Sequence, residues 1–281
     1  MTTLFIFTIP ISDDGGNKMK VKTAVCTSVG RKREVNQDNF CVNGFINSDA
    51  KTYILKSYFS SSKEQLLSVC DGMGGEKHGE IASLLASRQL AEYQEENPCL
   101  AEDFENHVRK FAFHANAAVC KYMESHGDEH MGSTLASLCI SPGHGKAMAA
   151  NVGDSKVYLF RDGNLEKLTV DHNVAQRLVD MGIITQEEAR THKEKSKLTQ
   201  HIGISPDELE IEPHISRAVE LKKGDLFLIC SDGLTDMLDE KAICDILASD
   251  GSVKEKCHTL VSTADQNGGT DNTTVVLALV K

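Results

Sequence analysis

Tryptophan is absent from this chain, and only five of its 281 residues are proline. No stretch approaches the ~20 consecutive apolar residues that a membrane-spanning helix needs, so we expect no membrane partner. The apolar start, MTTLFIFTIPIS, lacks both a basic first region and a cleavage site of small residues, which argues against a secretory signal.

Positive charge is scarce as well. Thirty Lys and Arg residues face 41 Asp and Glu residues, which gives a formal net charge of -11. Nucleic acids and anionic membranes are bound mainly through Lys and Arg. We therefore expect no nucleic-acid partner, although an anionic substrate would need only a local positive site.

The nine cysteines include no Cys-x-x-Cys pair, and their number is odd. Cys26, Cys70, Cys139 and Cys230 lie inside apolar runs, where cysteine behaves as a small hydrophobic residue. This usage predicts reduced, buried thiols and a cytoplasmic location rather than a disulfide framework.

What the chain does contain is the composition of a globular protein, with 40% hydrophobic and 25% charged residues. Apolar residues recur with helical spacing in three segments, and one of these begins with a capping box at Ser252 and Glu255. The predicted helices are 79–97, 101–125 and 253–266. The predicted strands are 21–28, 66–70, 133–140, 146–152, 156–160, 226–230 and 273–280.

Two pairs of these strands are predicted to form hairpins, one through SPGHG and one through Asp162-Gly163. Residues 171–205 are polar and lysine-rich, and Thr185 with Glu188 forms another capping-box pattern, which predicts a helical insertion. Central helices with hairpin-linked strands before and after them predict an α+β fold rather than alternating βαβ units.

Aspartates stand beside the ends of several strand-like runs. Asp71, Asp154 and Asp232 each follow an apolar run, Asp271 precedes the last one, and Asp38 lies in REVNQDNF. Carboxylates that converge to ~4 Å would repel each other by roughly 4 kcal/mol per pair at an effective dielectric constant near 20, unless a cation lies between them. An all-oxygen ligand set favours Mg²⁺ or Mn²⁺ over zinc.

Glycines crowd in behind Asp71 in the segment DGMGG, where they would let the backbone come close to a metal. Taken singly, each Asp-Gly pair is better explained as an ordinary turn, and only the occurrence of three or four such sites together, with Arg33 nearby in the sequence, favours a metal site. A dinucleotide-binding motif from Gly72 fails at Lys77, and a P-loop from Gly74 fails at Glu80.

A zinc site is also conceivable at His126, Asp128, Glu129 and His130, but we favour a solvated loop there. No HExxH motif occurs.

Seven segments together resemble the metal-dependent Ser/Thr protein phosphatases of type 2C, and their spelling is closest to the bacterial branch. In chain order they are GRKREVNQD, VCDGMGG, MGSTLAS, NVGDSKVYLFRDG, LTVDHN, GDLFLICSDGL and GGTDNTTVV. The resemblance as a whole runs from about residue 22 to 280. The resemblance implies an αββα sandwich of two antiparallel β-sheets flanked by helices. It also implies one phosphatase domain at 20–281 with a flap insertion at about 171–205. Residues 1–19 are then an N-terminal tail, which we take as a candidate disordered segment or an upstream start that is not used.

Site residues follow from the same resemblance, position by position, around two Mg²⁺ or Mn²⁺ ions. Asp71 matches the carboxylate that bridges both ions, and the carbonyl of Gly72 matches a ligand of one of them. Asp232 and Asp271 match the carboxylates that complete the other ion. Asp38 matches the acid that binds or orients the waters on the metals.

Arg33 matches the arginine that grips the phosphate, although Arg31-Lys32-Arg33 could also be only a solvated basic run. A third, weaker ion is common in the family, with an acid just before the GST segment as a ligand. Asp128 and Glu129 both fit that place, and we choose Asp128. The resemblance gives Asp154 a structural role.

The implied reaction is hydrolysis of phosphoserine and phosphothreonine in proteins. Two cations lower the pKa of a shared water, and the resulting hydroxide attacks phosphorus in line while Arg33 holds two phosphate oxygens. Two positions depart from animal members, where Gln37 is Glu and Met73 is a His proposed as general acid. The leaving group must then be protonated by water on the metals or by another residue.

We expect phosphorylated proteins as substrates, an opposing Ser/Thr kinase and a monomer. One alternative is a non-catalytic relative that binds proteins, but such relatives usually lose the metal acids, and here all four are present. Another is a phosphatase dedicated to a single partner, such as a phosphorylated regulator of transcription. Lys193, Lys195 and Lys197 could steer an acidic substrate, although we favour a role in solubility.

Overall fold

The structure is a computed structural model. It describes residues 19–48, 54–61, 63–73, 78–97, 100–127 and 130–281. The predicted tail, apart from Met19, and the candidate ligand Asp128 lie outside these residues.

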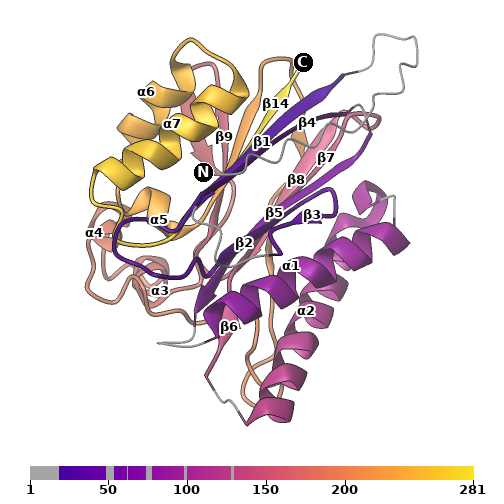
Figure 1. The fold of residues 1–281 in the computed structure, drawn as a ribbon, viewed down its shortest axis with the longest axis vertical. Helices are drawn as coiled ribbons and strands as arrows, with labels where there is room; N and C mark the ends of the chain where they lie inside the picture. The colour runs from indigo at the N-terminus through magenta and orange to yellow at the C-terminus, as the bar shows by residue number, and fades with distance from the viewer. Residues whose placement is uncertain (1–18, 49–53, 62, 74–77, 98–99, 128–129) are drawn as a thin grey trace, which may run out of the picture.

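Two antiparallel β-sheets form the centre of the molecule (Figure 1). In the first sheet, the order is β10-β9-β13-β14-β1-β4. Its strands are β1 (Val21–Ser28), β4 (Ile54–Ser61), β9 (Lys156–Arg161), β10 (Asn164–Lys167), β13 (Leu226–Cys230) and β14 (Thr273–Val280).

The second sheet has the order β11-β8-β7-β5-β2-β3, with β6 paired to β5 and β12 paired to β8. Its strands are β2 (Asp38–Val42), β3 (Phe45–Ile46), β5 (Gln65–Met73), β6 (Gly132–Ser133), β7 (Leu135–Ser141), β8 (Lys146–Val152), β11 (His214–Ile215) and β12 (Val219–Glu220).

Helices cover the outer face of each sheet (Figure 1). The second sheet packs against α1 (Gly79–Glu96) and α2 (Phe104–His126), with a 3₁₀ turn (Leu100–Asp103) between them. On the first sheet lie α5 (Asp232–Thr235), α6 (Glu240–Ala248) and α7 (Val253–Gln266).

Apolar side chains fill three layers, one between the sheets and one under each set of helices. Phe40 and Val276 lie in the central layer, Leu90 and Phe111 under α1 and α2, and Leu260 under α7. The predicted αββα sandwich is confirmed.

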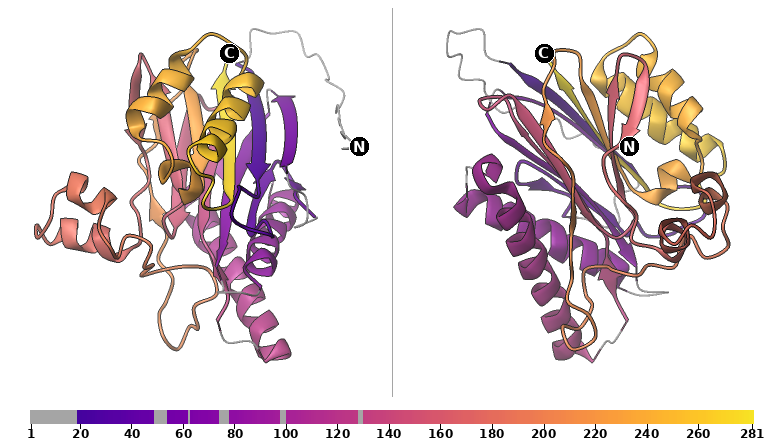
Figure 2. Two further views of the ribbon diagram at one scale, coloured as in Figure 1. Left: turned by 60° about the vertical axis from the view of Figure 1, so that its left-hand side comes forward. Right: turned by 180° about the vertical axis from the view of Figure 1, so that it is seen from behind.

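The segment 171–205 contains two short helices, α3 (Val174–Asp180) and α4 (Gln186–Arg190), as its capping-box pattern predicted. Figure 2 shows these helices projecting from the side of the sandwich. The two ends of the segment are tied together, because the Thr199 amide donates to the His172 carbonyl at 2.8 Å.

All the predicted strands are present to within a few residues, and the predicted helix at 101–125 begins instead at Phe104 after the 3₁₀ turn. Five strands of the described residues were missed. β2 and β4 were missed because DNFCV and ILKSYFSS carry too many polar residues to stand out as apolar runs, and β3, β11 and β12 because each is only two residues long. The Asp162-Gly163 hairpin is confirmed, with φ values of 52° and 80° that fit a type I′ turn.

One ion pair between a strand and a buried aspartate at the end of an exposed turn offers a test of the fold. Arg161 holds Asp225 through Nε and Nη2 at 2.6 and 2.7 Å, and the Asp225 side chain is only 1% exposed. Arg161→Ala leaves that carboxylate buried without its partner, so the free energy of unfolding in urea should fall by about 3 kcal/mol. Arg109→Ala removes an exposed pair with Glu105 and should cost at most about 0.5 kcal/mol. Equal losses in the two variants would contradict this account of the ion pair.

Candidate active site

Four of the predicted acids meet at one end of the sandwich. Asp38 is the first residue of β2 and lies directly opposite Asp71 on β5 in the strand register. Asp232 begins α5 just after β13, and Asp271 stands just before β14. Because β13 and β14 are antiparallel neighbours, these last two positions lie at the same end of their sheet.

Asp38 is the most deeply buried of the four, at 2% exposure. Burial raises its pKa to about 7 against the lowering effect of hydrogen bonds from Ser231 and Thr274, and the charges of Asp232 and Asp271 add to the rise. The Ser231 hydroxyl donates to Oδ2 of Asp38 at 2.7 Å. The side chain is therefore held in one position despite its unfavourable charge.

The pKa values of Asp71 and Asp232 are also raised. Burial and then the charges of Asp38 and Asp232 raise the pKa of Asp71 well above its ordinary value. Burial and the neighbouring Asp236 raise the pKa of Asp232, and Lys156 opposes that rise. Ionised together, these carboxylates repel one another in a desolvated place, which is the condition that a bound cation relieves.

The backbone around Asp71 is clamped from two sides. The Thr134 amide donates to the Asp71 carbonyl at 2.8 Å, and the Asp71 amide donates to Oγ1 of Thr134 at 2.9 Å. At Gly72, a Cβ atom would lie 2.0 Å from the Gly79 carbonyl oxygen and 2.5 Å from that of Gln37. Only glycine fits where β5, the start of β2 and the start of α1 come together.

This donor set fits hard cations, since it consists of carboxylate and carbonyl oxygens. Within the described residues, no three His, Cys, Asp or Glu side chains form a metal-holding group of their own. An ion at this place would therefore need the Gly72 carbonyl or water to complete its coordination.

Arg33 lies in the exposed loop between β1 and β2, and its Nη2 donates to Oδ2 of Asp271 at 2.7 Å. The two side chains are 47% and 40% exposed. Long-range folding thus brings the one predicted cationic residue to the edge of the acid cluster. A guanidinium has five N–H donors, so a single bond to Asp271 does not exhaust them.

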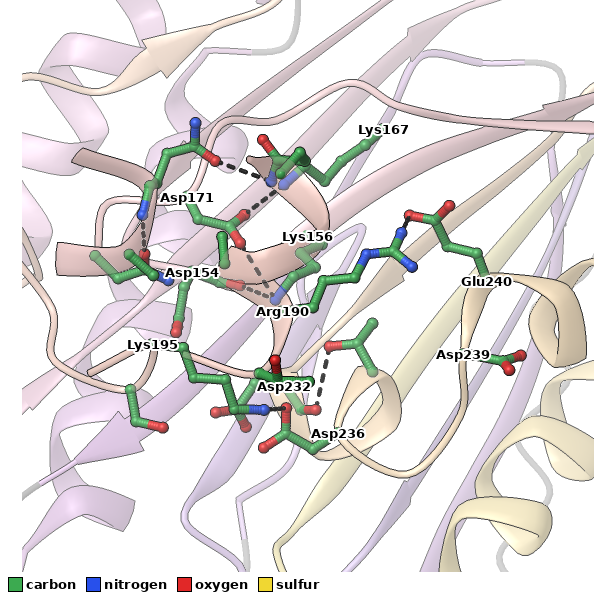
Figure 3. Close-up of a pocket in the computed structure, with 18 of the residues that line it drawn as sticks. Asp154, Lys156, Lys167, Asp171, Arg190, Lys195, Asp232, Asp236, Asp239 and Glu240 are labelled. Atoms are coloured by element: carbon green, nitrogen blue, oxygen red, sulfur yellow. Dashed lines mark hydrogen bonds and ion pairs between the residues drawn. The ribbon is translucent and has the colours of Figure 1, made fainter. Parts of the chain in front are cut away.

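Beside Asp232 lies a cavity of about 700 Å³, between the α3–α4 segment and helices α5 and α6 (Figure 3). Ion pairs cross it, from Lys195 to Asp236 at 2.7 Å and from Arg190 to Glu240. Of the three lysines considered for substrate steering, Lys195 thus already has an acidic partner.

Sequence reasoning set Asp154 aside as structural, yet its carboxyl group belongs to the same electrostatic environment. Burial and then the charge of Asp232 raise its pKa to about 7, while Lys156 opposes the rise. The signal for it was present in the sequence, because NVGDS ends an apolar run in the same way as VCDG does. Ser231 and Thr134 were missed because no local pattern shows that they support an acid elsewhere in the chain.

The support of Asp38 by Ser231 can be tested directly. Ser231→Ala removes the hydroxyl that donates to Asp38 and that also accepts the Thr274 amide at 2.9 Å. For the phosphatase activity that the sequence resemblance implies, we expect kcat at saturating Mn²⁺ to fall roughly tenfold, which corresponds to losing one charge-assisted hydrogen bond. The exposed Ser249, whose hydroxyl bonds only within its own helix end, provides the control variant Ser249→Ala. Equal kcat values in both variants would contradict this role.

Comparison with known proteins gives this geometry a context. The chain is 35% identical over 254 residues to the serine/threonine phosphatase stp of Listeria welshimeri, covering 89% of this chain and 92% of that protein. It is 34% identical over 261 residues to the protein phosphatase PhpP of Streptococcus pneumoniae, covering 92% and 96%.

Solved structures agree. The Streptococcus agalactiae serine/threonine phosphatase matches with a TM-score of 0.78 at 30% identity, over 93% of this chain and all of that one. The catalytic domain of the phosphatase PstP, solved in complex with two manganese ions, matches with a TM-score of 0.72 at 32% identity, over 93% and 99%.

The fold and these relatives define a serine/threonine protein phosphatase of bacterial type. Residues 39–275 match the family Protein phosphatase 2C, and the chain belongs to that family. None of the helices in the described part of the chain is long and apolar enough to cross a membrane.

Proposed function

We propose that this phosphatase hydrolyses phosphoserine and phosphothreonine in proteins with two Mg²⁺ or Mn²⁺ ions held at the acid cluster. The observation that carries the proposal is the convergence of four carboxylates at one end of the sandwich. Asp38, Asp71 and Asp232 are desolvated there, and the more exposed Asp271 lies at their edge. A related phosphatase of the same fold holds two manganese ions.

In this proposal Asp71 would be shared by both ions, the Gly72 carbonyl would be a ligand of one, and Asp232 and Asp271 would hold the other. Asp38 orients the water around them, in the position that Ser231 fixes. When bound, the ions lower the pKa of the water between them, so that hydroxide becomes available for in-line attack on phosphorus.

Arg33 binds the phosphate. Its planar guanidinium can hold two phosphate oxygens at once and offset negative charge as the bond to the leaving group breaks. In the present structure Asp271 accepts from it, so Arg33 is already beside the place where we expect the phosphate. A substrate phosphate would replace Asp271 as the anionic partner of Arg33.

A cysteine nucleophile is disfavoured by the environment of the thiols near the site. Burial raises the pKa of Cys70, the neighbour of Asp71, to about 12, and that of Cys230 to about 12 as well. Nucleophilic attack needs a thiolate, so these groups stay protonated and do not react. This supports direct attack by water rather than a phosphocysteine intermediate.

We further propose a cytoplasmic monomer that opposes a Ser/Thr kinase. A third ion with Asp128 as ligand, and the flap role of residues 171–205, remain parts of this proposal. Residues of this segment form one wall of the cavity beside Asp232, which supports a role in contacting the chain around a phosphoresidue.

Phosphate release from synthetic peptides tests the substrate class. We expect turnover of phosphoserine and phosphothreonine peptides with Mn²⁺, and at least about a hundredfold lower kcat/KM for the matching phosphotyrosine peptide, whose longer, rigid side chain places phosphorus farther from the backbone. Turnover of one phosphoprotein but of no peptide would favour the dedicated phosphatase instead. No turnover, together with no Mn²⁺ binding in calorimetry, would favour the non-catalytic relative.

A further inference from the structure

The loop between β1 and β2, residues 29–37, carries Arg33 but has little apolar anchoring of its own. Residues 31–35 are all exposed. Such a loop would ordinarily sample many conformations, and a mobile Arg33 would bind phosphate only at an entropic cost.

A single buried side chain ties this loop down at three points. Asn272 is 3% exposed and stands directly before β14. Its Nδ2 donates to the carbonyls of Val29 at 2.9 Å and of Val35 at 3.0 Å, and its Oδ1 accepts from the Gln37 amide at 2.8 Å.

These three bonds use both amide hydrogens and the amide oxygen of Asn272. They fix the first residue of the loop and two residues near its end, on either side of Arg33. The end of the loop is also held by the buried Asn36, whose Nδ2 donates to Oγ1 of Thr27 at 2.8 Å. Between the two carbonyls that Asn272 holds lies the short arc 30–34, in which the Arg31 amide donates to the Gly269 carbonyl at 2.8 Å.

The neighbour of Asn272 completes the arrangement. Asp271 accepts from Arg33, while its Oδ1 accepts the Asn272 amide at 2.8 Å. Two consecutive residues therefore hold this region: Asn272 fixes the backbone conformation of the loop, and Asp271 orients the guanidinium of Arg33.

We propose that Asn272 is a positioning residue that acts through Arg33, by holding the 29–37 loop in the conformation that binds the phosphate. The inference rests on the proposed role of Arg33. No other residue type of similar size offers two donors and one acceptor in this geometry, because Asp lacks the donors and Leu lacks all three groups.

Kinetics of the metal-loaded enzyme test the proposal through the variants Arg33→Ala, Asn272→Ala and the double variant. Arg33→Ala should raise KM for a phosphopeptide at least about tenfold, as expected for one lost charge-assisted contact. Asn272→Ala should raise KM about five- to tenfold with a smaller change in kcat. In the Arg33→Ala background, Asn272→Ala should change KM by less than about twofold, because coupled residues are not additive.

Two further measurements separate positioning from general damage. Amide hydrogen exchange in Asn272→Ala should rise in residues 29–37 and stay unchanged in β13 and β14. Asn116→Ala is the matched control, since Asn116 is also buried and also bonds two backbone groups, at Gly203 and Ile204. It should lower the melting temperature without raising KM. If Asn272→Ala does not fold, Asn272→Ser keeps one hydroxyl at the position and should show the same effects in weaker form.

Each outcome bears on one of the two claims. A normal KM in Asn272→Ala and Asn272→Ser, with a raised KM in Arg33→Ala, would overturn the positioning role and leave the proposed function intact. A loss confined to kcat, with a higher Mn²⁺ requirement, would show that Asn272 acts on Asp271 instead and would also overturn it. A normal KM in Arg33→Ala would refute the phosphate-binding role itself, and the inference would fall with it.

Discussion

Asp71→Asn protein is expected to retain its fold and to lose on the order of a thousandfold in kcat with Mn²⁺ present, a loss of about 4 kcal/mol in transition-state stabilisation. The substitution keeps the shape of the side chain but removes the charge that we expect to be shared between two ions. Asp71 faces Asp38 across the β2–β5 ladder, so the substitution changes the centre of the acid cluster.

Stability distinguishes this effect from simple damage. In metal-free protein the charge of Asp71 is disfavoured by burial and by its acidic neighbours. Asp71→Asn should therefore melt no lower than the wild type in EDTA. The control is Asp162→Asn, an exposed turn residue with φ of 52° that asparagine also tolerates. Wild-type activity in Asp71→Asn would refute the metal mechanism.

Removal of divalent ions should have the largest effect of all. With excess EDTA, phosphopeptide hydrolysis should fall to the background rate, and Mn²⁺ should restore it, because in the proposed reaction the attacking water is activated by the ions. The melting temperature should rise together with activity, since an ion at a hundred times its Kd stabilises the folded state by about 2.7 kcal/mol per site.

Calorimetry of Mn²⁺ binding to the metal-free protein gives the number of ions that each chain binds. We expect at least two ions per chain, and a loss of binding in Asp232→Asn. Activity that survives dialysis against EDTA would contradict the account, as would a melting temperature that does not respond to Mn²⁺.

Helices and strands of the sandwich were predictable where one face of the element is apolar, or where a long run of consecutive residues is apolar. The apolar strands β13 and β14 and the amphipathic helix α2 were found in this way. The strand β2 was not, because it begins with Asp38 and Asn39, whose polarity serves the site and the adjoining turn rather than the core. The polar residues of β2 thus interrupt the apolar pattern from which a strand is recognised in a sequence.

The site was predictable as a set of residues but not as a geometry. Asp71 and Asp232 could be found because each ends an apolar run and is followed by glycine. That Asp38 lies opposite Asp71, and that Asn272 reaches Val29, depends on strand register over separations that no local pattern encodes. The family resemblance supplied roles for these acids, whereas the supporting residues emerged only from the hydrogen bonds.

A crystal structure of the protein grown with Mn²⁺, with the ions located by anomalous scattering, tests the central claim most directly. We predict two manganese ions at the end of β5. Asp71 should contact both ions, and Asp232 and Asp271 should contact the same ion. An ordered structure in which this place holds no manganese, or in which Asp71 contacts neither ion, would contradict the account.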